Sequence, residues 1–165
     1  MGLDKHLIVT ATPKADTEQT VTEGNLRVTV LSPCLIRVEK SASRTFTDEA
    51  TQTVLNRVFP NTAFTKTADP QYLTIKTEKA SFKVPFGNEK LHCIPCGTTE
   101  YIPCRNKNNL KGTARTLDGV ACPIPVADGV LSKDGAAILD DSRSLVFGEN
   151  GELKHRRAPE YDAYV

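Results

Sequence analysis

The sequence predicts an all-β fold, an antiparallel β-sandwich, and three segments carry this prediction. Residues 25–31 and 34–40 alternate apolar with polar side chains, and the "SP" between them is a turn signal that makes them a hairpin. Residues 71–87 alternate again, and their apolar positions are Leu73, Ile75, Phe82 and Val84. Because every second side chain of a strand points to the same face, each segment is expected to bury one face. Many short strands with frequent turn signals favour a sandwich over a parallel α/β sheet.

The remaining segments add a second hairpin, one ambiguous stretch and a long irregular one. Residues 144–154 predict a hairpin, because Gly148 to Gly151 supply turn residues between two short runs. Residues 46–59 fit a helix capped near Thr47, but they fit a loop equally well because their threonines disfavour a helix. Residues 88–130 have little periodicity, and long irregular segments in compact domains are usually functional or disordered.

Length and composition predict one soluble domain over residues 1–165. The chain is 39% hydrophobic and 25% charged, which is ordinary for a globular protein. Its net charge is +1 and no basic block stands out, so neither nucleic acid nor a membrane surface is an expected partner. Apolar runs such as "HLIVTA" are far shorter than the ~20 residues of a membrane span, and no signal peptide is recognisable. A cytoplasmic location is therefore expected.

The chain has five cysteines, Cys34, Cys93, Cys96, Cys104 and Cys122. An odd number without a signal peptide argues against a disulfide framework. Four thiolates, those of Cys93, Cys96, Cys104 and Cys122, or three of them with the adjacent His92, could hold a tetrahedral zinc ion, but the usual second C-x-x-C is missing. The favoured interpretation is free thiols packed as small apolar groups, so no metal and no cofactor are expected.

No motif indicates a self-contained active site. The three histidines are far apart, and no serine lies in a G-x-S-x-G context. Among the acidic residues, Asp118 precedes Gly119 and Asp134 precedes Gly135, which suits turns in which the side chain bonds its own backbone. Catalytic residues are therefore not expected within the chain.

Two stretches in the second half carry a resemblance to a known family. "NLKGTARTLDGV", then "GVLSKDGAAILDDSRSLVFGENGELKHR" and "YDAYV" occur in this order, and they resemble the end of the N-terminal β-sandwich of glycoside hydrolase family 31. The resemblance is specific over residues 109–165 and weaker over 24–84. The chain departs from the pattern at Ala136, where family members often have an aromatic residue. The cysteine cluster is not part of the pattern.

The resemblance implies an accessory role for this chain. The family includes α-glucosidases and α-xylosidases, and its N-terminal domain is a galactose-mutarotase-like supersandwich. Both catalytic aspartates come from a (β/α)8 barrel that would follow "YDAYV", so the chain ends where that barrel would begin. The implied partners are this barrel of the same polypeptide and an α-linked sugar.

The resemblance also implies which residues reach the sugar. In relatives, a loop of the sandwich leans over the barrel mouth, and Asp118 and Arg115 are the corresponding substrate-binding candidates. A carboxylate can accept two sugar hydroxyls while an arginine fixes its position. It is equally open that "RTLD" only builds the loop and packs it on the barrel. Asp140 and Asp141 are interpreted as structural.

Two other function classes stay open. A free-standing carbohydrate-binding sandwich would use exposed aromatics to stack on sugar, but the chain has no tryptophan and four tyrosines. A zinc-stapled interaction domain would depend wholly on the cysteine cluster.

Overall fold

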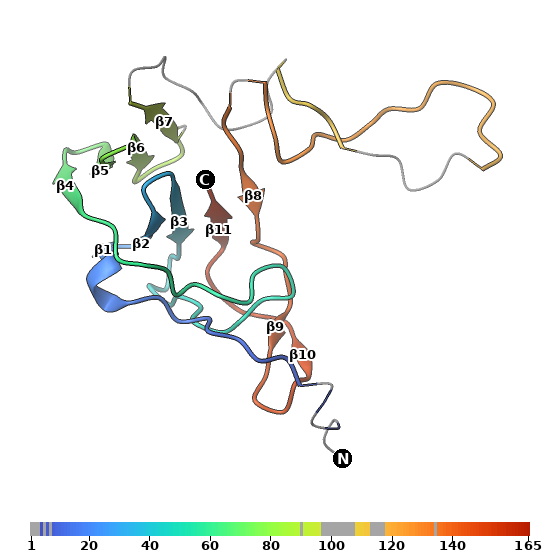
Figure 1. Cartoon of the computed structure of the whole chain (residues 1–165), viewed down its shortest axis with the longest axis horizontal. Coiled ribbons are helices and arrows are strands. Elements are labelled where there is room, and N and C mark those ends of the chain that lie inside the picture. The colour runs from blue at the N-terminus through green and yellow to red at the C-terminus, as the bar shows by residue number, and fades with distance from the viewer. Residues whose placement is uncertain are drawn as a thin grey trace.

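The computed structural model describes residues 4, 6, 8–89, 91–96, 108–112, 118–133 and 135–165. Over these residues the predicted all-β class is confirmed, because nearly all regular structure consists of strands in antiparallel sheets (Figure 1). A short 3-10 turn, η2 (Thr17–Gln19), lies directly before the first strand, and its N-cap is Asp16. The described residues contain no helix with the length and hydrophobicity of a transmembrane span.

Two larger sheets build the sandwich, and a small ribbon accompanies them. The five-stranded sheet has the order β1-β2-β3-β11-β8, with β1 (Thr20–Glu23), β2 (Leu26–Ser32), β3 (Leu35–Lys40), β11 (Tyr161–Tyr164) and β8 (Leu139–Asp140). The four-stranded sheet has the order β4-β5-β6-β7, with β4 (Phe64–Ala68), β5 (Tyr72–Thr77), β6 (Ala80–Pro85) and β7 (His92–Pro95). The ribbon pairs β9 (Val146–Phe147) with β10 (Leu153–Lys154).

Both predicted hairpins are confirmed, and the third alternating segment turns out to be two strands. β2 pairs antiparallel with β3, and β9 pairs antiparallel with β10. Residues 71–87 fold into β5 and β6, in which Ile75 lies opposite Phe82. The Thr77 hydroxyl organises the turn between them, because it accepts hydrogen bonds from the amides of Lys79 and Ala80.

Residues 46–59 form a loop, so the helical alternative for this segment is wrong. The hydroxyl of Thr51 accepts a hydrogen bond from the Val54 amide at 2.9 Å, and the Thr51 amide donates to the Val54 carbonyl at 3.0 Å. Threonine side chains that bond nearby backbone in this way compete with helix formation. Arg57 also holds this loop against the protein. Its side chain is buried on the outer face of the five-stranded sheet and donates to the Tyr164 hydroxyl.

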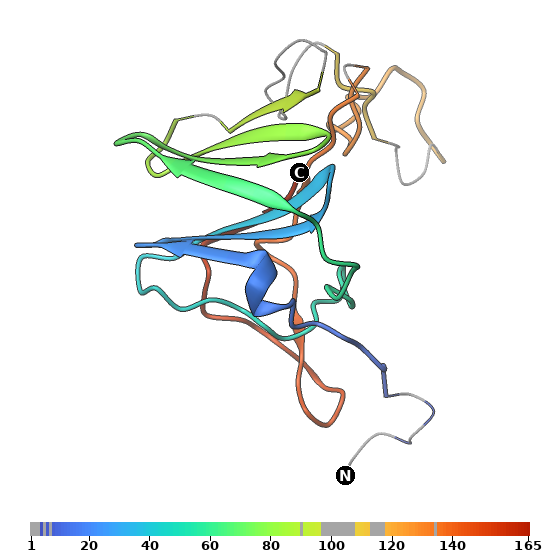
Figure 2. The same cartoon turned by 60° about the vertical axis from the view of Figure 1, so that its left-hand side comes forward.

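The hydrophobic core lies between the two large sheets, which Figure 2 shows stacked one above the other. Its fully buried members alternate along the strands and come from both sheets: Leu26, Val28, Ile36 and Val38 from the five-stranded sheet, and Leu73, Ile75, Phe82 and Val84 from the four-stranded sheet. Apolar area removed from water is the main favourable term in folding, so this layer joins the two sheets into one unit.

We expect Phe82→Ala to lower the free energy of unfolding by about 3–5 kcal/mol, because the substitution leaves a cavity between the sheets. Urea denaturation followed by circular dichroism measures this loss. The matched control is Phe59→Ala, at a side chain that is 44% exposed, where a change within about 0.5 kcal/mol is expected. Equal losses in the two variants would contradict this assignment of the core.

Candidate functional site

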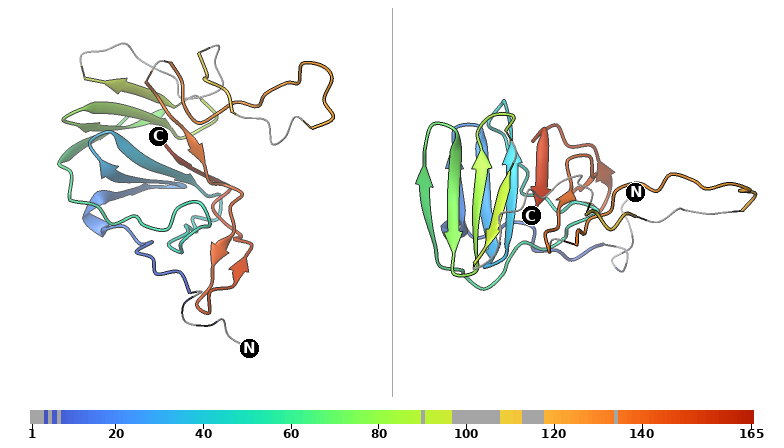
Figure 3. Two further views of the ribbon diagram at one scale, coloured as in Figure 1. Left: turned by 45° about the vertical axis from the view of Figure 1, so that its right-hand side comes forward. Right: turned by 90° about the horizontal axis from the view of Figure 1, so that it is seen from above.

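A projecting segment carries the residues that the sequence singled out. Residues 118–133 extend away from the sandwich in Figure 1 and in both views of Figure 3, and we call the described residues 108–112 and 118–133 the arm. Its two sides pair through backbone hydrogen bonds, from Leu110 to Leu131 at 3.0 Å and from Gly112 to Ala127 at 2.7 Å. These hydrogen bonds hold the two sides of the arm together, and most of the arm belongs to the irregular segment 88–130 predicted from the sequence.

Asn109 and Gly129 hold the base of the arm closed. The Asn109 side-chain oxygen accepts from the amides of Lys111 and Gly129, and its nitrogen donates to the Gly129 carbonyl at 2.9 Å. A Cβ atom on Gly129 would lie 2.5 Å from the Lys111 carbonyl oxygen, so only glycine allows the two sides to approach this closely. A cavity of about 750 Å³ lies beside this base, between residues 126–130 and 138–140.

Asp118 lies in an exposed turn of the arm, and Gly119 follows it with φ +74°. A left-handed residue directly after an aspartate fits the turn predicted from the sequence. Arg115, the second predicted binding residue, lies outside the described residues, as does Asp134. The expected pairing of Asp118 with Arg115 therefore stays a prediction.

Asp140 and Asp141 have the contacts of structural residues. Asp140 accepts from the amide of Ser142 at 3.0 Å and from its hydroxyl at 2.6 Å, which closes a local turn. Asp141 is fully buried and accepts from the Thr51 hydroxyl at 2.8 Å. These contacts agree with the structural role that the sequence analysis gives to both carboxylates.

The described cysteines do not gather into a metal site. Cys93 packs against the core. Its burial, and to a smaller extent the charge of the neighbouring Cys34 thiol, raise the pKa of the Cys93 thiol to about 11. Cys96 is exposed, and its thiol donates to the Glu78 carbonyl. His92 lies edge-on to the Tyr72 ring, and Cys104 lies outside the described residues. Within the part of the chain that the structure describes, no three histidine, cysteine or acidic side chains are grouped as metal ligands.

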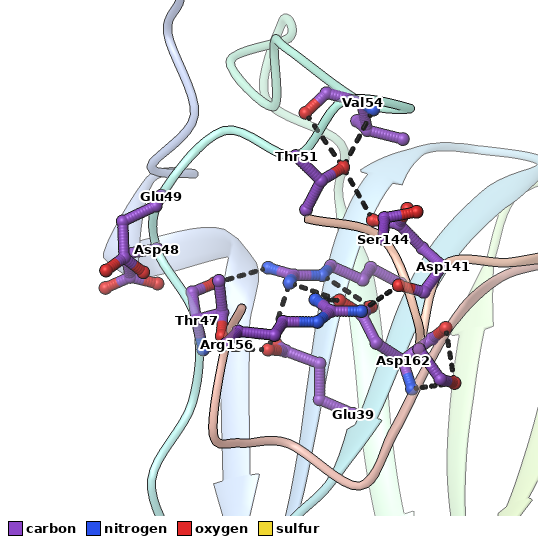
Figure 4. Close-up of polar contacts among 12 residues, drawn as sticks. Glu39, Thr47, Asp48, Glu49, Thr51, Val54, Asp141, Ser144, Arg156 and Asp162 are labelled. Atoms are coloured by element: carbon purple, nitrogen blue, oxygen red, sulfur yellow. Dashed lines mark hydrogen bonds and ion pairs between the residues drawn. The ribbon is translucent and has the colours of Figure 1, made fainter. Parts of the chain in front are cut away.

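Sequence reasoning missed a layer of buried charges on the outer face of the five-stranded sheet. Arg37 donates from Nε and Nη2 to both carboxylate oxygens of Asp162, at 2.9 and 2.7 Å. Arg27 donates in the same forked manner to Glu39, at 2.6 and 3.0 Å. Arg156 donates to the same Asp162 oxygen, Oδ2, at 2.7 Å, and Figure 4 shows Arg156, Glu39 and Asp162 close together.

The pKa values in this layer follow from burial and ion pairing. Burial raises the pKa of the Asp162 carboxyl, but Arg37 and Arg156 outweigh it and hold that pKa below its ordinary value. For Glu39, burial outweighs Arg27 and Arg37, so its pKa is raised. A raised carboxyl pKa is typical of a general acid, but Glu39 is fully buried and out of reach of any substrate. We therefore assign this layer a structural role.

No protein-family model matches the chain, and a search of curated proteins returned no match either.

We expect Asp162→Asn to lower the free energy of unfolding at neutral pH by about 3–5 kcal/mol, because it leaves buried guanidinium groups without their carboxylate. Since the folded pKa of Asp162 lies below its ordinary 3.8, its stabilisation is complete above that pH and is lost as the pH falls through the folded value. Urea titrations at several pH values should therefore show that the difference in free energy of unfolding between wild type and Asp162→Asn becomes smaller below about pH 4.

The matched control for this prediction is Lys66→Met. Lys66 and Glu23 form an exposed ion pair, so a change within about 0.5 kcal/mol is expected at every pH. The assigned role of the Asp162 charge would be contradicted if wild type and Asp162→Asn differed in free energy of unfolding by the same amount at every pH at which the protein folds.

Proposed function

We propose that this chain is the N-terminal accessory domain of a retaining α-glycosidase of the family 31 type. In this proposal a catalytic (β/α)8 barrel of the same polypeptide hydrolyses the O-glycosyl bond, and the sandwich contributes no catalytic residue. The order of the three motif stretches over residues 109–165 supports the assignment, as does the all-β class of the chain. A cytoplasmic setting belongs to the same proposal.

The position of Asp118 on the arm is the observation that carries the proposal. Asp118 is exposed on a segment that projects away from the sandwich (Figure 1). A carboxylate in such a position can accept hydrogen bonds from two hydroxyls of a sugar bound elsewhere. Arg115, three residues earlier, is the proposed group that orients it.

The apolar side chains of the arm supply a reason for it to pack on a barrel. Several large apolar residues are exposed along it, with Leu110 at 51%, Val130 at 46% and Leu131 at 57%. Contiguous exposed apolar surface is costly in water and typically marks a contact with another protein surface. In the proposal these residues face the barrel rim, and Asp118 then lies over the sugar site.

We expect Asp118→Ala, made in the polypeptide that carries both sandwich and barrel, to lower kcat/KM on α-linked substrates by roughly tenfold to hundredfold. The reason is the loss of charge-assisted hydrogen bonds worth about 1.5–3 kcal/mol, while the barrel keeps its acid and nucleophile. Steady-state kinetics on aryl α-glucosides and α-xylosides measures the loss. Most of this loss in kcat/KM should appear as an increase in KM if the contact between Asp118 and the sugar is equally strong in the ground state and the transition state.

Two controls separate binding from folding. Asp128→Ala removes another carboxylate of the arm, one that pairs with Lys111, and should leave kcat/KM nearly unchanged. The isolated 165-residue chain should not cleave these substrates above background. An unchanged kcat/KM in Asp118→Ala beside a clear fall in Tm would mean that "RTLD" only builds the loop.

A further inference from the structure

A second cavity, remote from the arm, opens on the outer face of the five-stranded sheet. Its volume is about 360 Å³, and it lies between the N-terminal segment before β1 and strands β1 to β3. Figure 1 shows η2 and β1 on the opposite side of the molecule from the arm. Volumes of roughly 300–1,000 Å³ are usual for small-molecule sites, so this cavity is large enough for a compact ligand.

The strand register explains why the floor of this cavity is polar. Thr22 lies opposite Arg27, and Thr20 lies opposite Thr29, so all four side chains share the outer face of the sheet. The hydroxyl oxygens of Thr20 and Thr29 are 3.4 Å apart. The opposite face of the same strands is the apolar core. The cavity floor is thus a row of hydroxyls on rigid strands, with Thr17 adding a fourth from η2.

The charges of the floor are already compensated. Arg27 contacts the carboxylates of Glu39 at 2.6 Å and of Asp48 at 2.8 Å. Arg37 contacts those of Glu39 at 3.1 Å and of Asp162 at 2.7 Å. Each guanidinium in the floor therefore has two carboxylate neighbours. Their N–H groups are already directed at these carboxylates and at the Thr47 carbonyl. Of the carboxylates only Asp48 lines the cavity, and its charge would repel an entering oxyanion such as phosphate or sulfate.

The groups that remain suit a neutral ligand rich in hydroxyls. The hydroxyls of Thr17 and Thr22 can both donate and accept, whereas the Thr20 hydroxyl donates to a backbone carbonyl at 3.1 Å and can only accept from a ligand. The ammonium of Lys14 donates, and the carboxylate of Asp48, whose side chain is 47% exposed, accepts. A ligand hydroxyl can donate to one such group and accept from another at the same time. We propose that this cavity binds a neutral polyol of monosaccharide size, at a site separate from Asp118 and independent of the proposed glycosidase role.

The test is a titration of the chain with D-glucose, D-xylose and D-galactose, followed by the amide and threonine-methyl resonances. Saturable shifts of Thr20, Thr22 and Thr29 with at least one sugar are expected. Thr22→Val should weaken that binding by about twofold to tenfold, because it removes one hydroxyl and keeps the shape. Valine suits an exposed strand position, so the variant should fold. Thr67→Val, an exposed threonine of β4 outside the cavity, is the matched control and should bind like wild type.

Asp48→Asn decides between a neutral and an anionic ligand. For a polyol this variant should bind about threefold to tenfold more weakly, because a charged acceptor is lost. For an oxyanion it should bind more tightly, because a repulsive carboxylate is gone, so the same titration is run with inorganic sulfate. Saturation by sulfate that strengthens in Asp48→Asn would overturn the proposal. The proposal would also be overturned if no sugar gave saturable shifts, or if the shifts were confined to the arm. Equal sugar affinities of Thr22→Val and Thr67→Val would overturn it as well.

Discussion

The bidentate contact between Arg37 and Asp162 fixes where the end of the chain lies. These residues are 125 positions apart, and the two parallel N–H···O bonds require β11 to lie beside β3 in one register. The same guanidinium binds the Thr47 carbonyl at 2.9 Å, so it also holds the loop that covers the sheet. Because a buried ion pair gains little over apolar packing but is costly to break, its main effect is to specify this arrangement.

This layer makes the five-stranded sheet polar on one face and apolar on the other. Along β3, Ile36 and Val38 point into the core while Arg37 and Glu39 point outward, yet all four are buried. A strand that is buried on both faces normally reads as a continuous apolar run. Here the outer face is covered by loops instead of solvent, and paired charges take the place of apolar side chains. Outward-facing side chains of the same sheet, Thr20, Thr29 and Arg37 among them, line the cavity beside η2.

The sequence was sufficient for the fold class and for the paired strands whose alternation is local. It did not separate β5 from β6, although the apolar phase changes between Ile75 and Phe82, which indicates a turn. The burial of Arg37 could not be foreseen, because "IRVEK" has the pattern of a half-exposed strand and its partner Asp162 is distant in sequence. Of the predicted site, Asp118 is exposed on the arm, and its contact with a sugar stays a prediction. Local pattern thus predicts elements, whereas long-range ion pairs decide how they are covered.

Amide hydrogen exchange in an Arg37→Met variant tests most directly whether this ion pair fastens β11 to β3. The Val165 amide donates to the Ile36 carbonyl at 2.9 Å and reports on that seam, while Ile75 reports on the other sheet. We predict that the variant loses more protection at Val165 than at Ile75, because β11 opens locally once its side-chain tether is gone. Equal losses at both amides, or undiminished protection at Val165, would contradict the account.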